Sequence, residues 1–411
     1  MKKLLQPQYV GKFACIGGAC ADSCCIGWRV TIDKDTYHKY RACPDDQLRA
    51  LMDEQVTRTR DNKGADSYAK VRLRADGSCP FLSEEKLCLI QQKLGEQYLS
   101  NTCANYPRTI NQVNDALERS LTMSCPEAAR LALMDEKPME FDEIAADVPA
   151  ERLVINKKID ASAVRAAFKP ERYFWELRVF IISLLQDRRF PLWVRLAVLG
   201  LFCQKLDELA RTGQSKEIPV LIGTYLNRLD SGVLAEELAN VPGQPVIQML
   251  LVKELADERI FAGITNRRFL ECFAEFLLGL NYTADAAKDE IGARYAEAGR
   301  DWYLPFIAKH GHMLEHYLVN YVFKTLFPFS GEKHVFDNYV LMAVHYAMLK
   351  VLLTGMAAHH KDKLGAEHAL KLIQSFAKVV EHNNAYLKNV IRLLKDNKFD
   401  TLAHMVILVR D

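Results

Sequence analysis

The distribution of cysteines is the feature that most constrains how this chain folds. Nine of its eleven cysteines lie within the first 125 residues. Seven of these nine form a tight pattern, and an outlying eighth precedes them. The eight candidate metal ligands are Cys15, Cys20, Cys24, Cys25, Cys79, Cys88, Cys103 and Cys125. So many thiols in a short stretch predict either a disulfide framework or a metal centre, and the redox compartment decides between the two.

The start of the sequence favours a reducing compartment. Met1 to Pro7 contains two lysines but no apolar run long enough for the core of a signal peptide, because Gln6, Pro7 and Gln8 interrupt it. We therefore expect a cytoplasmic protein whose thiols bind metal. No membrane span is expected either, because the most apolar windows, around Val179 to Leu185 and Val340 to Gly355, carry charge or stop short of the length that crosses a bilayer.

The charge balance excludes one class of partner. Lysine and arginine number 54 against 52 acidic residues, which gives a formal net charge of +2. Such a chain has no strong positive field to attract nucleic acid, so nucleic acid is not an expected partner. The sequence does not indicate the oligomeric state.

The pattern of apolar and polar residues predicts an α+β protein that begins with a small domain over residues 1–126. Short alternating segments, such as Trp28 to Ile32 and Val71 to Leu73, are typical of half-buried strands. Helices are expected near Asp45 to Arg58 and Glu84 to Gln97. The core of this domain would be thin, so a metal centre is expected to stabilise it.

A second domain, mainly α-helical, is predicted over residues 171–411. Residues 127–170 form a transition with three prolines and one short strand at Arg152 to Asn156. Beyond Pro170 apolar residues recur at steps of three and four, as in Leu192, Leu196 and Leu199. Typical helix and loop lengths give about eight to eleven helices, arranged as a bundle.

The spacing of the thiols can be compared with known metal chemistry. Eight candidates exceed what one mononuclear site uses, so they predict a polynuclear cluster, two sites, or one site with spare thiols. Adjacent Cys24 and Cys25 point to opposite faces in a strand, so they either occupy a turn or serve different roles. Widely separated ligands favour a large, soft iron-sulfur centre, with zinc as the alternative. The remaining cysteines, Cys43, Cys203 and Cys272, are interpreted as small buried hydrophobic residues.

At this point the motifs resemble a known family. Cys15-x4-Cys20-x3-Cys24-Cys25 resembles a stretched form of the CxxCxxCC iron- or zinc-chelating domains. Together with Cys79-Pro80-Phe81-Leu82, Cys103-Ala104-Asn105-Tyr106-Pro107-Arg108, Gly27-Trp28-Arg29, Asn320-Tyr321-Val322-Phe323 and Phe327-Pro328-Phe329, it is similar to bacterial flagellin lysine-N-methylases. The resemblance implies transfer of methyl groups from S-adenosylmethionine to surface lysines of flagellin by an enzyme that carries a [4Fe-4S] cluster.

The sequence lacks the signatures of two common cofactor sites. There is no G-x-G-x-G or G-x-G-x-x-G loop, and Gly27 stands where a C-x3-C-x2-C motif that begins at Cys20 would need its third cysteine. As a hypothesis, three thiolates around a [4Fe-4S] cluster would leave one iron open to the amino and carboxylate groups of S-adenosylmethionine. Direct transfer further needs a neutral lysine amine, and therefore a base or a dry pocket. The candidate bases lie near the motifs in the sequence: Asp33, Asp35, Tyr37 and Tyr106. For each of them a structural role is the simpler interpretation.

Two other function classes remain open. The segment His312-Met313-Leu314-Glu315-His316 contains H-x-x-E-H, the inverted zinc-protease motif, although an apolar helix stripe follows it directly. A zinc hydrolase using His312, Glu315 and His316 is therefore one alternative. A non-catalytic iron- or zinc-binding interaction protein is the other, but the long helical half exceeds what a metal carrier needs.

Overall fold

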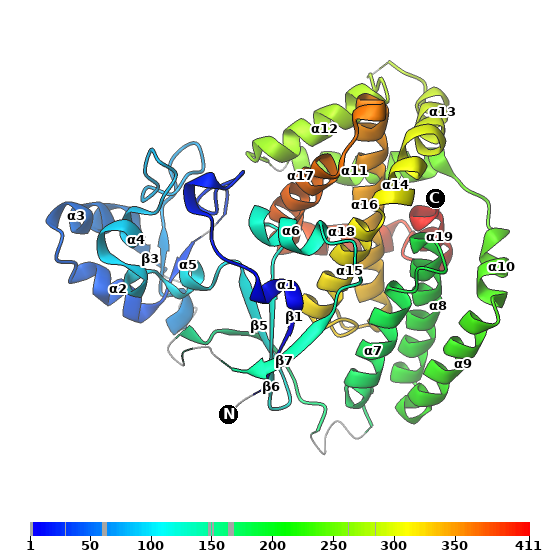
Figure 1. Ribbon diagram of the computed structural model, residues 1–411, viewed down its shortest axis with the longest axis horizontal. Coiled ribbons are helices and arrows are strands. Elements are labelled where there is room, and N and C mark those ends of the chain that lie inside the picture. The colour runs from blue at the N-terminus through cyan, green and yellow to red at the C-terminus, as the bar shows by residue number, and fades with distance from the viewer. Residues whose placement is uncertain are drawn as a thin grey trace.

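The computed structural model describes residues 3–28, 30–59, 64–146, 149, 152–162, 168–261, 263–283 and 285–411. Arg29 of the motif quoted above lies outside this set. Figure 1 shows three parts: a small lobe in blue and cyan, a sheet in the centre, and a large helical body that extends to the C-terminus. A mixed-sheet region followed by helices confirms the predicted α+β fold class.

The small lobe is built on a three-stranded antiparallel sheet in the order β2-β4-β3. Its strands and helices are β2 (Thr31–Ile32), α2 (Lys34–Arg41), α3 (Asp46–Gln55), β3 (Val56–Arg58), β4 (Ala69–Val71), α4 (Leu89–Leu94) and α5 (Asn101–Asn105). The helix predicted at Asp45 to Arg58 ends at Gln55, because the β-branched Val56 and Thr57 pair with β4 instead. The helix predicted at Glu84 to Gln97 is much shorter, since Gly95 adopts a φ of +85° and ends it.

A five-stranded mixed sheet joins the lobe to the helical body. Its order is β7-β1-β6-β5-β8, and β1 pairs parallel with β6 and antiparallel with β7. The strands are β1 (Lys3–Pro7), β5 (Arg108–Val113), β6 (Ala116–Leu121), β7 (Phe141–Ala145) and β8 (Ile155–Ile159). Residues 127–170, predicted as a transition, therefore supply two strands of this sheet. The strand predicted at Arg152 lies three residues further along, because Ile155 to Ile159 pair with β5.

The helical body contains thirteen α-helices after residue 173 in the described part of the chain, more than the eight to eleven predicted, because several are short. Besides the four helices of the small lobe, α1 (Gln8–Gly11) and α6 (Pro126–Leu133) precede them. The thirteen are α7 (Phe174–Leu185), α8 (Leu192–Arg211), α9 (Ile218–Asp230), α10 (Val233–Ala239), α11 (Pro245–Phe261), α12 (Arg267–Gly279), α13 (Lys288–Ala298), α14 (Leu304–His310), α15 (His312–Thr325), α16 (Val335–His360), α17 (Ala366–Phe376), α18 (Asn384–Asp396) and α19 (Leu402–Val409).

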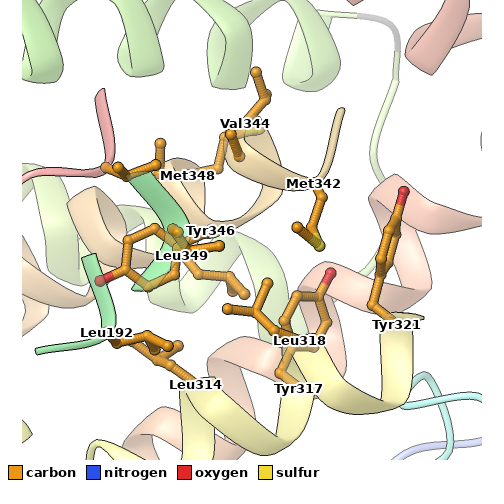
Figure 2. Packing of buried hydrophobic residues seen from close by; sticks show 14 of the residues in the cluster. Leu192, Leu314, Tyr317, Leu318, Tyr321, Met342, Val344, Tyr346, Met348 and Leu349 are labelled. Carbon is orange, nitrogen blue, oxygen red and sulfur yellow. The ribbon is translucent and has the colours of Figure 1, made fainter. Parts of the chain in front are cut away.

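Helix α16 is the centre of this body. Its apolar side chains pack against α15 and α8, as Figure 2 shows for Met342, Tyr346 and Leu349 facing Leu314 and Leu318. On another face, Gly355 of α16 meets Gly279 of α12 so closely that a Cβ built on Gly279 would lie 1.9 Å from the Gly355 carbonyl oxygen. With the turn that follows it, α16 extends to Lys363, and among the described helices it alone is long and apolar enough to cross a membrane, with a mean hydropathy of 1.6. Its most apolar stretch is wholly buried inside the fold.

Candidate metal and active site

All eight predicted thiols line one cavity of about 350 Å³, which we call the cysteine cavity. Cys15, Cys20, Cys24 and Cys25 come from the loop before β2, which we call the cysteine loop, and Cys79 follows β4. The other three lie on helices: Cys88 and Cys125 are the N-cap residues of α4 and α6, and Cys103 lies within α5. The fold thus brings together segments that are up to 110 residues apart in the sequence, and every cysteine of the chain is free.

Backbone hydrogen bonds explain how the small lobe positions its thiols. The Cys79 amide donates to the Cys25 carbonyl at 2.7 Å, which aligns the cysteine loop with the segment after β4. The Leu89 amide donates to the Phe81 carbonyl at 2.8 Å, which folds the Cys79 to Cys88 segment back on itself. The Ser100 side chain caps α5 by accepting from the Cys103 amide at 3.3 Å. Local turn chemistry therefore sets three of the thiol positions.

The thiols form two neighbourhoods that share Cys24. Electrostatic interactions connect Cys103 with Cys79, Cys88 and Cys24, and Cys25 with the same three residues. Cys20 interacts with Cys15 and Cys24, and Cys125 with Cys20 and Cys24. Cys24 and Cys25 occupy a turn and are hydrogen-bonded to each other. Of the two geometries that the sequence left open for this pair, the structure has the turn.

Burial in the cavity keeps most of its thiols protonated. Burial raises the pKa of Cys79 to about 11 and those of Cys103 and Cys125 to about 12. Cys24 is different, because a hydrogen bond with Cys25 and the nearby Lys378 ammonium lower its pKa to about 7. A metal that binds here would displace several thiol protons, so its affinity would increase with pH.

The cysteine loop is fastened to the helical body through Asp22. The Asp22 carboxylate accepts from Lys378 Nζ at 2.9 Å, from Gln374 Nε2 at 3.1 Å and from Asn266 Nδ2 at 3.3 Å. Lys378 also donates to the Ser23 carbonyl at 2.8 Å. These helical residues were not among the predicted site residues, because no local motif marks them, although Asp22 itself lies inside the cysteine motif.

A second, larger cleft of about 690 Å³ adjoins the cysteine cavity, and we call it the polar cleft. The two share the wall formed by Trp28, Tyr106, Pro107 and Arg108. The Trp28 and Tyr106 ring centroids lie 5.3 Å apart. Across the polar cleft from the small lobe, the lining comes from α15, α16 and the π-helical segment Ala377–Glu381. A ligand of cofactor size fits this volume.

Ser124 connects this wall to the C-terminal helices. Its hydroxyl lies 3.1 Å from Tyr106 Oη and 2.9 Å from His382 Nε2, and its carbonyl accepts from Gln374 Nε2 at 2.9 Å. Because Cys125 is the next residue, the same turn contributes to both the cavity and the cleft. Ser124 and His382 carry no sequence signal that could have identified them.

The four candidate bases lie in different surroundings. Asp33 caps α2, accepting from the Thr36 amide and, through its second oxygen, from the Asn101 amide, each at 2.9 Å. Asp35 is exposed in the first turn of α2. Tyr37 accepts from Arg41 and packs its ring against Tyr68, outside both cavities. Tyr106 is the one of the four that lines the cavity and the cleft.

The H-x-x-E-H segment is part of the packing between helices. Glu315 is 1% exposed and is paired with Arg188 at 2.8 Å and Arg195 at 2.7 Å. His316 is equally buried, with Nδ1 2.8 Å from the Ala132 carbonyl oxygen. The Glu315 carboxylate is therefore already paired with two guanidinium groups, whereas a zinc hydrolase would need it free. Within the described ranges, no three His, Cys, Asp or Glu side chains converge closely enough to hold a single ion, here or among the cysteines.

Comparisons with known proteins agree on one family. A model described as the FliB lysine N-methylase C-terminal domain matches residues 178–408. The chain is 25% identical over 394 residues to a lysine-N-methylase of Salmonella typhimurium, covering 94% of each chain. It is also 35% identical over 139 residues to the flagellar biosynthetic protein FliU of Salmonella muenchen, covering 34% of this chain and 81% of that protein. No solved structure matches the chain.

Proposed function

Because the chain belongs to the FliB lysine N-methylase family, we propose that it transfers methyl groups from S-adenosylmethionine to surface lysines of flagellin and carries a [4Fe-4S] cluster in the cysteine cavity. The observation that carries the cluster is that eight free thiols, drawn from five separate segments of the fold, line a single cavity. A cytoplasmic location is part of the proposal, because free thiols in this number persist in a reducing compartment.

The donor set suits a cluster better than one ion. Four thiolates around zinc stand about 4 Å apart, since each zinc–sulfur bond is about 2.3 Å long. In the described residues no three thiols are gathered that tightly, while the cavity is large and its far wall is apolar, with Phe81, Ile90 and Leu99. Soft thiolates at wide spacing are typical iron-sulfur ligands. Zinc remains the outcome that would contradict this assignment.

The chain's own residues would divide the work as follows. A bound cluster would supply an open iron that the amino and carboxylate groups of the methyl donor could chelate. Three of the four thiols in the neighbourhood of Cys25, Cys79, Cys88 and Cys103 would hold it and leave one iron open. The Trp28 and Tyr106 rings separate the cysteine cavity from the polar cleft and offer aromatic faces near it. Asp22 and Lys378 keep the cysteine loop in register with the cleft.

Anaerobic purification with iron and sulfide counts, followed by methyl transfer to flagellin, tests the proposal. We expect about four iron atoms per chain, and loss of both iron and transfer in Cys103→Ala. Cys203→Ala is the matched control, because this thiol is fully buried in α8 away from the cavity and should leave both unchanged. Stoichiometric zinc, or full transfer by a cluster-free variant, would contradict the proposal. Metal without donor binding would instead favour the non-catalytic alternative.

A further inference from the structure

The helical side of the polar cleft has a floor made of Tyr321, Lys324, His345 and Glu381. These side chains are buried: His345 is 1% exposed, and the Lys324 and Glu381 side chains are 13% and 6% exposed. Lys324 and Glu381 form an ion pair, and Tyr317 lies behind the floor on α15. In Figure 2 Tyr317 and Tyr321 project from successive turns of that helix.

For the hydrogen bonds among Glu381, Tyr317 and His345, only one assignment of donors and acceptors is consistent. Burial acts to raise the pKa of Glu381, but the Lys324 ammonium outweighs it and the pKa is lowered, so this group is a carboxylate and can only accept. Burial raises the pKa of Tyr317, which keeps its single proton and donates it to Glu381. The Tyr317 oxygen must then accept from His345 Nδ1, which lies 3.4 Å away. His345 is consequently the tautomer with its proton on Nδ1, and Nε2 carries a free lone pair.

That lone pair has no partner within the described residues. Nε2 of His345 is buried without a hydrogen bond, although the residue lines the polar cleft. Buried polar atoms in folded proteins almost always have partners, so an orphan acceptor at the floor of a cleft marks the place of a ligand donor. Burial together with Lys324 lowers the pKa of His345 to about 4 against the opposing effect of Glu381, so the ring is neutral at pH 7.

The surroundings select the chemistry of the donor. Glu381 is already paired with Lys324, and the whole lining carries four cationic side chains against three carboxylates, so a further ammonium ion is disfavoured. The cations are Arg108, Lys157, Lys324 and Lys388, and the carboxylates are Asp66, Glu332 and Glu381. Leu341 and Leu387 line the same cleft and suit an alkyl chain. A neutral primary amine on an alkyl chain meets both conditions: it donates an N–H and keeps a lone pair. That lone pair is what attack on a methyl sulfonium requires.

We infer that the polar cleft binds the target lysine side chain as a neutral amine whose N–H is donated to His345 Nε2. The assignment of this amine as the methyl acceptor rests on the proposed function, whereas the binding itself does not. Glu381 and Tyr317 are positioning residues, because they fix the tautomer without contacting the amine. The lysine gives its proton to solvent before it enters, so binding strengthens as pH rises toward about 10.

Binding of a probe tests this inference independently of methyl transfer. The anaerobically purified full-length protein would be titrated calorimetrically at pH 9 with Nα-acetyl-lysine amide, and with Nα-acetyl-norleucine amide, which lacks the amine. We expect His345→Phe to weaken lysine-probe binding about tenfold or more, in line with the loss of a buried hydrogen bond. Tyr317→Phe should weaken it severalfold, because it frees the tautomer. The norleucine probe should not distinguish these variants from the wild type.

His316→Phe is the matched control. His316 is as buried as His345 and has the same orphan Nε2, but it does not line the cleft, so its replacement should leave probe affinity unchanged. Wild-type affinity in both folded variants, His345→Phe and Tyr317→Phe, would overturn the inference while leaving the proposed function intact. Amine binding that depends on His345 in a protein that never methylates flagellin would instead contradict the proposed function alone.

Discussion

Asp22 and Lys378 form an ion pair of 2.9 Å that joins the cysteine loop to the π-helical segment Ala377–Glu381. Their side chains are 12% and 8% exposed, so the pair is shielded from solvent. The ammonium also lies close enough to Cys24 to lower the pKa of its thiol. This ion pair thus holds the cysteine loop in place and also lowers the pKa of Cys24, a candidate metal ligand.

Lys378→Met should therefore loosen the loop and weaken metal retention. Removing one partner of a buried pair leaves Asp22 uncompensated and costs on the order of 3 kcal/mol. The pKa of Cys24 should rise, which a thiol-alkylation rate measured against pH on metal-free protein would show. Lys205→Met is the control, because Lys205 pairs with Glu208 on an exposed helix face and should change stability by less than about 1 kcal/mol. Equal iron retention in both variants would show that the pair does not fasten the loop.

The buried imidazole of His345 should make stability depend on pH. Its pKa is about 4 in the folded chain and about 6.5 in an unfolded one. The unfolded state binds more protons between these values, so this contribution is complete above pH 6.5 and is lost as pH falls toward 4. The loss is on the order of 3 kcal/mol. Urea unfolding of wild type and His345→Phe across this range measures it; parallel pH profiles would refute the assignment.

The close approach of α12 and α16 should not tolerate a side chain. A Cβ on Gly355 would lie 2.4 Å from Phe276 Cδ2 and 2.8 Å from its carbonyl oxygen. Gly355→Ala should destabilise the protein by about 1–3 kcal/mol or more, because neighbouring backbone must move. Gly223→Ala in α9 is the contrast, since nothing lies within 4 Å of its Cβ position, and it should stabilise by up to about 1 kcal/mol. Denaturation midpoints that fail to diverge in this way would contradict the packing.

The structural assignment of the H-x-x-E-H segment can be tested separately. Glu315→Gln leaves the buried Arg195 guanidinium without its carboxylate and should cost on the order of 3 kcal/mol. His312→Ala should change neither zinc content nor methyl transfer, because His312 serves no site. Elemental analysis and thermal melting of the two variants measure these effects. Zinc that disappears on replacing His312 would restore the hydrolase alternative.

The sequence predicted those parts of the site that local chemistry determines. The eight cysteines, the helix that begins near Asp45 and the helical period of α8 can each be recognised within a few residues. The five-stranded sheet could not be predicted in the same way, because its order depends on pairing between β1 and strands more than 100 residues later. The cleft floor was missed for a related reason: Lys324, His345 and Glu381 look like ordinary helix residues until three elements meet.

The position of β1 as the second of five strands also ties the N-terminal segment to distant parts of the chain. The partners of Lys3–Pro7, β6 and β7, lie at residues 116–121 and 141–145, more than 100 positions further along the sequence. The cysteine loop in turn contacts Gln374 and Lys378 in the C-terminal helices. A fragment that ends before residue 366 would therefore keep all eight thiols and lose the contacts that fasten their loop.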